Sequence, residues 1–412
     1  MQKKIIILAI AAALSVPSLV AADSRYVNVY GTAKLSFDRV DSGGSKGIGT
    51  NQVSSNGSFI GFKGSKEIGD DMSVIWQVEQ MVNLDNSSTT SSDGYGNTLA
   101  TRNTFVSLWS SDYGIFAMGR YNTPYKIVSR HMDVFADTIA DNRSLMGGAS
   151  LDLDMLSNTD ATGTPGYGAS AGASFDGNQG DVAAWVSPSY KDFMFALAYV
   201  AGAEAASLKA DDKGDAWSSA LLYSNGTLEV NLGYELHNFG SPNTGTLGPA
   251  AGAGALGGTG VDLRDREEYA WKLAASYVFD QFVIYGVYEQ THDDLGGTPL
   301  GGSQGSSWFG HKSAYLGGKY QRGKNTVTAA YTYHGDLDMD GNGSDTGAQQ
   351  FSLGYSYKLD RSTSLFGVYS RMENEKNARF NLSSADGSTG SALASGAGAD
   401  PFAFSIGVKH KF

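Results

Sequence analysis

One stretch of this chain has residue types and spacing that could bind a metal ion. The run 338–343 places oxygen-bearing side chains at alternate positions and a glycine at the sixth, like the opening of a calcium-binding loop. The twelfth position of such a loop should be glutamate, and here it is Gln349. The flanking sequence also predicts strands where a calcium loop would have helices. We therefore predict an exposed acidic loop with no metal site.

An enzymatic site is not identifiable in the sequence. The six histidines show no metal-binding spacing, and neither a Gly-x-Ser-x-Gly motif nor a phosphate-binding lysine motif occurs. His292, followed by Asp293 and Asp294, falls in a predicted loop, where we expect it to be solvated. Covalent catalysis requires a nucleophile beside a base. We predict that the protein is not an enzyme and has no cofactor.

The first 22 residues have the order of a secretory signal peptide. Lys3 and Lys4 precede an apolar run over 5–16, and small residues end at Ala22. The apolar run is shorter than the roughly 20 residues that a transmembrane helix needs. We predict a cleaved signal peptide over 1–22 and one domain over 23–412. That exported domain contains no cysteine, so hydrogen bonds and packing must hold it together.

The charge balance excludes one class of partner. Without Lys3 and Lys4, 28 basic residues remain of the 30, against 42 acidic ones, so the net charge is −14. Nucleic-acid binding requires clustered basic residues that neutralise phosphates. We therefore expect no nucleic-acid partner.

Apolar and polar residues alternate along much of the chain. In the stretch 227–235, Leu228, Val230, Leu232 and Tyr234 alternate with polar residues and glycine. This period of two is typical of strands with one apolar face. Sixteen such strands are predicted, near 25–39, 57–68, 71–84, 101–110, 113–121, 181–190, 192–200, 215–224, 226–237, 265–279, 281–291, 310–321, 323–334, 347–359, 361–373 and 401–412.

The links between these strands are alternately short and long. Asn225-Gly226 is a strong two-residue hairpin signal, whereas the links near 40–56 and 122–180 are long. Short turns at one rim and long loops at the other are the layout of an outer-membrane barrel. The sequence thus predicts an all-β fold, a 16-stranded antiparallel transmembrane β-barrel whose interior is too wide for side chains to fill.

Several segments resemble the general-diffusion porins of Gram-negative bacteria, such as those of Neisseria and Burkholderia. They are Val29-Tyr30-Gly31, the runs 60–65, 76–79 and 119–126, Phe135-Ala136-Asp137-Thr138, and the closing run 407–412. The resemblance implies a water-filled outer-membrane channel, embedded in lipid, for passive diffusion of ions and small hydrophilic solutes. It also implies a homotrimer. Finally, it implies that the terminal Phe412 serves as a signal to the barrel-assembly machinery.

In this family the third loop folds into the lumen and narrows it. The resemblance implies this role for the segment from Thr123 to about Asp160. The charged residues expected at the constriction from this loop are Arg130, Asp133, Asp137, Asp141 and Arg143, with Asp152 and Asp154 further along.

The opposing wall residues follow from the alternation. Val27, Val29, Leu35 and Phe37 set the apolar face of the first strand, so Lys34 points inward. The same argument predicts the wall residues of the constriction: Lys34, Lys63, Glu79, Arg102 and Arg120. A basic wall facing an acidic loop would set a transverse field across the passage.

The sequence also departs from this family, whose members often carry an arginine just before the run 60–64. Here that position is Phe59. Together with the net charge of −14, the missing arginine favours a weak preference for cations.

Two alternatives stay open. One is a substrate-biased channel of the same fold for sugars, phosphate or organic acids. The other is an exported β-sandwich adhesin, whose apolar faces would be internal.

Overall fold

The computed structural model describes most of the chain. It covers residues 27–43, 49–69, 71–85, 99–147, 175–201, 214–238, 267–293, 310–338, 343–382 and 396–412. The predicted signal peptide lies outside these residues, as do residues 339–342 of the calcium-like run and both Asp152 and Asp154.

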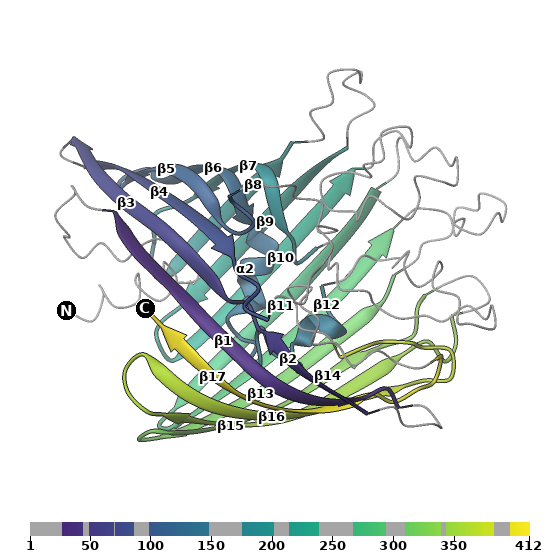
Figure 1. The fold of residues 1–412 in the computed structure, drawn as a ribbon. Coiled ribbons are helices and arrows are strands. Elements are labelled where there is room, and N and C mark those ends of the chain that lie inside the picture. The colour runs from purple at the N-terminus through teal and green to yellow at the C-terminus, as the bar shows by residue number, and fades with distance from the viewer. Residues whose placement is uncertain are drawn as a thin grey trace.

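The described residues are almost all strand (Figure 1). The strands of the first half are β1 (Asn28–Asp41), β2 (Thr50–Ser55), β3 (Phe59–Gly69), β4 (Met72–Met81), β5 (Thr104–Ser110), β6 (Gly114–Asn122), β7 (Asn178–Val186), β8 (Phe193–Val200) and β9 (Asp215–Ser224). Those of the second half are β10 (Leu228–Asn238), β11 (Glu267–Phe279), β12 (Phe282–Asp293), β13 (Lys312–Arg322), β14 (Asn325–His334), β15 (Ala348–Lys358), β16 (Thr363–Asn374) and β17 (Phe402–Lys411). Within the described part, no helix is long and apolar enough to cross a membrane.

The strands close into a barrel. From β3 to β17, each strand pairs antiparallel with the next, and β17 pairs with β1 from Thr32↔Lys411 to Asp41↔Phe402. On its other side β1 pairs with both β2 and β3, which lie end to end. The 17 strands therefore occupy 16 positions, and the predicted 16-stranded barrel is confirmed.

Strand β2 corrects one sequence expectation, because 50–55 falls inside the predicted loop 40–56. The segment was missed because Thr50–Ser55 is almost entirely polar and so lacks an apolar alternation. Gly57, with φ of 65°, interrupts the pairing before β3 begins. Even there, the Asn56 amide still donates to the Lys34 carbonyl (2.9 Å), which keeps both strands beside β1.

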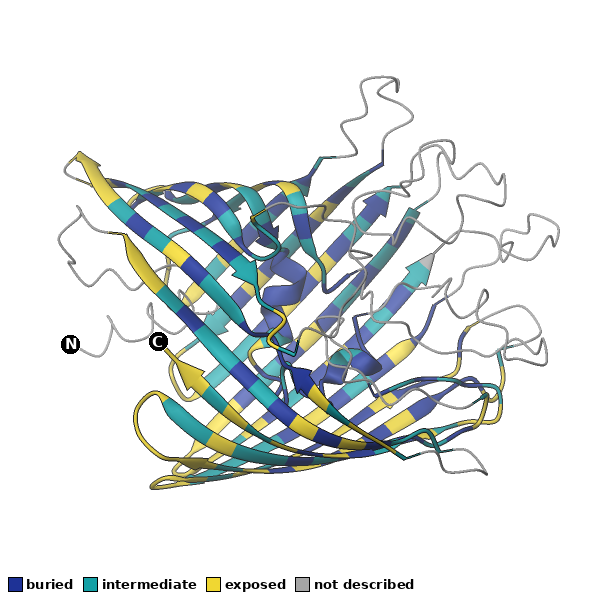
Figure 2. Cartoon of the chain, in the orientation of Figure 1, coloured by how far each residue is buried: buried dark blue, intermediate teal, exposed yellow. Residues whose placement is uncertain are grey.

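The apolar faces of the strands point outward. Val29, Phe37 and Phe404 are about half exposed, whereas Lys34, Asp38 and Ser405, on the opposite face of their strands, are buried. Figure 2 shows exposed and buried positions alternating along the strands. This alternation repeats around the barrel. A β-sandwich would hide its apolar faces inside, so the exposed apolar surface argues against the adhesin alternative. The surface instead suits contact with lipid.

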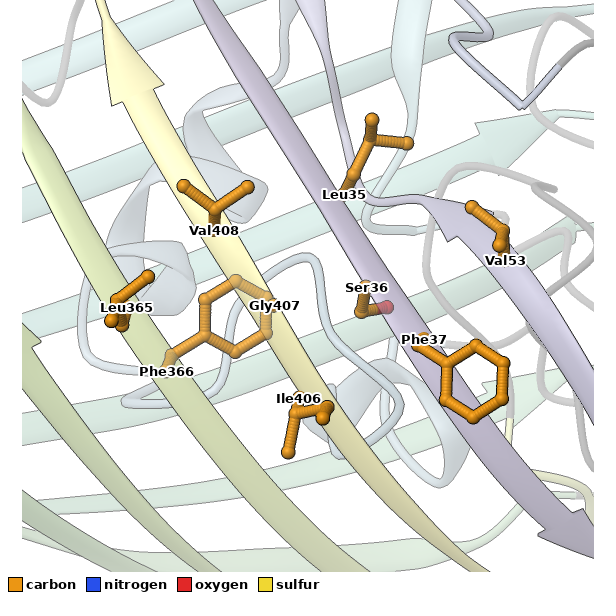
Figure 3. Close-up of a pocket in the computed structure, with 9 residues that line it drawn as sticks. All are labelled: Leu35, Ser36, Phe37, Val53, Leu365, Phe366, Ile406, Gly407 and Val408. Atoms are coloured by element: carbon orange, nitrogen blue, oxygen red, sulfur yellow. The ribbon is translucent and has the colours of Figure 1, made fainter.

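The outer face is also apolar across the neighbouring strands β1, β17 and β16. Leu35, Phe37, Ile406 and Val408 surround a shallow groove over Gly407 (Figure 3). A side chain at Gly407 would collide with the Phe366 ring and the Leu35 carbonyl. Glycine therefore allows close packing where the first and last strands meet.

Candidate functional site

The segment after β6 begins with a short helix that packs against the strands. Helix α2 (Pro124–Arg130) starts at Thr123, whose side chain accepts a hydrogen bond from the Lys126 amide, and Pro124 suits the first turn. Its residues Tyr125 and Val128 are fully buried, and it contacts β8, β9, β10 and β11.

Arg130, at the end of α2, gathers the acidic residues of this segment. Its Nη1 and Nη2 donate to the two oxygens of Asp141 at 2.9 and 2.7 Å, and Nη2 also donates to Asp137 Oδ1 at 2.6 Å. Asp133 Oδ2 lies 3.6 Å from Nη1. Paired donors on one carboxylate make this a strong, directional contact. The structure thus brings together four of the five predicted loop residues.

The carboxylates also organise the backbone around them. Asp141 caps the 3₁₀ helix η1 (Asn142–Ser144) by accepting from the Arg143 amide at 3.0 Å, and it accepts from the Asp137 amide at 2.8 Å. Asp133 accepts from the amides of Phe135 and Asn142. The fifth predicted residue, Arg143, places its Nε 3.5 Å from Asp141. Five charged side chains therefore form one cluster.

Burial and neighbouring charges separate the pKa values of the three carboxyls. Burial, reinforced by Asp141, raises the pKa of Asp133 to about 7. Burial opposes ionisation of Asp137 as well, but Arg130 and Lys34 outweigh it and hold that pKa well below its usual range. Arg130 and Arg143 likewise lower the pKa of Asp141 against the effect of burial. Asp133 is therefore the carboxyl of this cluster that titrates near neutrality.

Lys34 connects the wall to this cluster. Its Nζ donates to the carbonyls of Ala136 (3.2 Å) and Asp137 (2.7 Å), and the side chain is buried. The alternation in β1 predicted that Lys34 points away from the apolar face, and the structure agrees.

Three more predicted wall residues lie close together. The Tyr30 hydroxyl donates to Glu79 Oε1 at 2.7 Å, and Arg102 Nε lies 3.6 Å from Glu79 Oε2. Lys63 Nζ lies 4.6 Å above the centre of the Tyr30 ring. The guanidinium of Arg102 covers the Phe59 ring at 4.8 Å. The cationic Arg102 therefore lies over Phe59, the residue at which the sequence departs from the family pattern.

Arg120 is placed differently. It lies at an irregularity in the β6–β7 pairing, between Gly119 and Tyr121. Its Nη2 donates to the Asn178 carbonyl at 2.8 Å. This contact ties Arg120 to the start of β7.

Sequence reasoning missed a second charged group, on β11 and β12. Lys272 Nζ lies 2.7 Å from Asp176 Oδ1 and 3.1 Å from Glu289 Oε2, and it also donates to Ser129 Oγ at 3.3 Å. The Tyr125 hydroxyl donates to Glu289 at 2.8 Å. These contacts fix α2 to the wall. Lys272 and Glu289 are direct partners across the β11–β12 pair, so register would have revealed them.

Glu289 holds the far end of the segment as well. Its Oε1 accepts from the Gly147 amide at 2.7 Å. Next to this group His237 is buried between Glu235 (2.9 Å) and Glu268 (2.7 Å), and Phe175 stacks on its ring. Both ends of the described segment, 124–147 and 175–176, are therefore anchored on one side of the barrel.

A family model for Gram-negative porins matches residues 8–377. The chain belongs to this family. The resemblance inferred from the sequence motifs is therefore confirmed.

Individual relatives of this porin are more distant. Major outer membrane protein P.IA of Neisseria meningitidis is 33% identical over 96 residues, which cover 23% of this chain and 22% of that protein. P.IB of Neisseria gonorrhoeae is 31% identical over 120 residues, covering 28% of this chain and 32% of that protein. The chain thus matches only about a fifth to a third of the length of these curated relatives.

Solved structures share the fold of this porin over nearly its whole length. An anion-selective porin from Comamonas acidovorans has a TM-score of 0.66 at 20% identity, covering 94% of this chain and 99% of that one. The trimer form of OmpT from Vibrio cholerae has a TM-score of 0.59 at 15% identity, covering 94% and 99%. At these identities the comparison supports the barrel fold alone.

The carboxyl end of this porin lies at the β1–β17 seam. Phe412 exchanges backbone hydrogen bonds with Gly31 at 3.0 and 3.2 Å. Its ring, 56% exposed, lies where a side chain at Gly31 would be. Phe404, Ile406 and Val408 are exposed on the same face. The apolar face of the last strand therefore points outward.

Proposed function

We propose that this porin is an outer-membrane channel for passive diffusion of ions and small hydrophilic solutes. The observation that carries the proposal is the closed 16-position barrel with an apolar outer face and a polar inner face. Closure leaves no strand edge unpaired in lipid. A barrel of this size is too wide for wall side chains to fill, so water can occupy its interior. The porin family and the fold indicate a channel and not an enzyme.

We infer that the segment 123–147 folds into the lumen and narrows it. Hydrogen bonds link it to inner-face residues on well-separated strands. The Tyr315 hydroxyl on β13 accepts from the Val134 amide (3.0 Å), and Ser313 donates to the Leu145 carbonyl (3.1 Å). On β10, Asn231 donates to the Val128 carbonyl (3.1 Å). With the Lys34 contacts on β1, these bonds span the barrel.

The charges of the described residues support a preference for anions. The segment covers acidic wall residues, since Glu235, Glu268 and Glu289 are at most 1% exposed and are partnered by His237 or Lys272. Arg102 and Arg130 keep 29% and 18% of their side chains exposed, and Lys63 is half-buried. Among the three carboxylates around Arg130, Asp133 and Asp141 are fully covered and Asp137 keeps 35% of its side chain exposed, so the exposed cations outnumber the exposed acid. This local distribution opposes the weak cation preference expected from net charge. It agrees with the name of the Comamonas protein, an anion-selective porin.

We further propose a homotrimer in outer-membrane lipid, inserted by the barrel-assembly machinery. The trimer form of the Vibrio cholerae neighbour supports the oligomeric state, and the exposed apolar faces support the lipid contact. The signal peptide over 1–22 remains a prediction.

A planar-bilayer recording tests the channel and its ion preference together. We expect stepwise conductance increases in KCl and, in a salt gradient, a reversal potential of the sign that indicates chloride permeation. Absence of steps from correctly folded protein would refute the channel. Steps with a potassium preference would refute only the inferred selectivity.

A further inference from the structure

An aromatic pair flanked by two cations lies on the wall formed by β1 and β3. The rings of Tyr30 and Phe59 meet edge to face, with centroids 5.9 Å apart and planes at 75°. Lys63 Nζ lies 4.6 Å above the Tyr30 ring, and the Arg102 guanidinium lies 4.8 Å above the Phe59 ring. All four side chains are half-buried, so a solute on this wall can reach them.

Arg102 is paired with carboxylates less closely than Arg130 is. Its nearest carboxylate oxygen, Oε2 of Glu79, is 3.6 Å from Nε, which is beyond hydrogen-bond distance. Among the described residues Nε has no hydrogen-bond partner. The other oxygen of Glu79 is occupied by the Tyr30 hydroxyl. A guanidinium that lies over a ring and is only weakly paired with its carboxylate neighbour is suited to bind a further carboxylate.

The aromatic pair distinguishes among the anions that such a cation could attract. An inorganic anion would gain the charge of Arg102 but nothing from the rings. A planar aromatic solute would also cover the exposed parts of Phe59 and Tyr30, and ring pairs contribute beyond their buried area. The charge and the rings together therefore favour one chemical class, aromatic carboxylates.

The four residues adjoin the segment 123–147, which carries the carboxylates around Arg130 and is called the charged segment from here on. Gly57, two residues before Phe59, lies so close to Asp137 that an added Cβ would be 3.0 Å from the Asp137 side chain. Lys34, which binds the Asp137 carbonyl, pairs through its amide with Ser58 Oγ at 2.9 Å. A solute held at Arg102 would thus be held beside the inferred constriction.

We propose that Arg102, Phe59, Tyr30 and Lys63 form a subsite for aromatic monocarboxylates. The carboxylate pairs with Arg102 and the ring of the solute contacts Phe59 and Tyr30. This proposal rests on the proposed function, since the solute must enter the lumen. Binding must stay weak enough for release, as in any conducting pore.

Three sodium salts test the subsite by their effect on chloride current through the purified channel in a planar bilayer. They are benzoate, cyclohexanecarboxylate, which has a similar size without an aromatic ring, and acetate. We expect benzoate to reduce the current at about two- to twelvefold lower concentration than cyclohexanecarboxylate, the factor that about 0.5–1.5 kcal/mol per aromatic pair implies. Acetate should be the weakest of the three.

Two variants and a control complete the test. Phe59→Leu keeps an apolar side chain but removes one of the two rings, and it should reduce the difference between benzoate and cyclohexanecarboxylate. Arg102→Gln should weaken both. Lys319→Gln, which removes another lysine lying above a ring, that of Tyr285 at 5.9 Å, should change neither. Conductance in KCl alone shows that each variant folds.

The outcomes separate the subsite from the channel. Normal KCl steps with equal effects of benzoate and cyclohexanecarboxylate would overturn the subsite and leave the channel standing. An unchanged benzoate preference in Phe59→Leu would also overturn it. Absence of KCl steps in the parent protein would overturn the proposed function, and the subsite with it.

Discussion

Lys272 and Asp176 form a buried ion pair of 2.7 Å that joins strand β11 to the residues just before β7. The same lysine contacts Glu289 and Ser129, so it links both ends of the charged segment to one wall. Lys272, Asp176 and Glu289 stabilise the fold only together, because a buried charge without its partner raises the free energy of the folded state.

Replacing Lys272 by methionine should loosen the attachment of the charged segment to the barrel wall. Asp176 and Glu289 would remain buried without their cation, and removing one partner of a buried pair costs about 3–5 kcal/mol. We expect noisier single-channel currents and a lower unfolding temperature in detergent. Lys319→Met, at a half-buried lysine of the same inner face, is the matched control. Equal behaviour of the two variants would show that the anchor is unimportant.

Replacing Arg130 by glutamine should make the segment more acidic. Asp137 and Asp141 lose the guanidinium that holds their pKa values low. We expect the reversal potential in a KCl gradient to move toward potassium. The comparison variant is Arg143→Gln, because Arg143 Nε lies 3.5 Å from Asp141, farther than the 2.7 and 2.9 Å contacts of Arg130. A shift no larger than in that variant would contradict a special role of Arg130.

Asp133 should make stability depend on pH below neutrality. Burial raises its pKa to about 7 in the folded protein, above the ordinary value near 3.9. The folded state therefore holds a proton that the unfolded state releases, so stability should fall as pH rises between about 4 and 7. Unfolding temperature measured across this range should show this slope, and Asp133→Asn should flatten it. If the unfolding temperature of Asp133→Asn kept the same dependence on pH, a group other than Asp133 would be its cause.

Deleting Phe412 should impair assembly more than conduction. The residue ends the seam by pairing with Gly31, on the outer face and away from the charged segment. We expect less folded porin in the outer-membrane fraction, measured by heat-dependent mobility on gels, with a normal conductance per channel. Phe404→Ala, at another exposed phenylalanine of β17, controls for lost apolar surface. Wild-type amounts of folded protein after the deletion would refute the assembly role.

The strands were predictable because their alternation is local. The stretch predicted over 215–224 is strand β9 with the same bounds, and 265–279 differs from β11 by two residues. Strand β2 was not predictable in this way, since Thr50–Ser55 carries almost no apolar residue. Its pairing with β1 is a tertiary effect, which local periodicity cannot report.

The candidate site was predictable only in part. Alternation placed Lys34 and Glu79 on the inner face, and the family resemblance selected the segment around Asp137. The contacts of Lys272 depend on which residues of β11 and β12 are opposite each other and on where α2 lies. Neither can be read from the period of two. The same holds for Arg102, whose position over Phe59 only the structure reveals.

The pairing of β1 with β17 joins residues near the two ends of the chain, Thr32 and Lys411. The ring of strands cannot close before β17 has been synthesised. Until then both terminal strands expose unpaired backbone groups that could pair with other chains. Biogenesis should therefore need a helper that keeps the exported polypeptide unfolded, and truncation anywhere before Phe402 should yield aggregates instead of smaller pores.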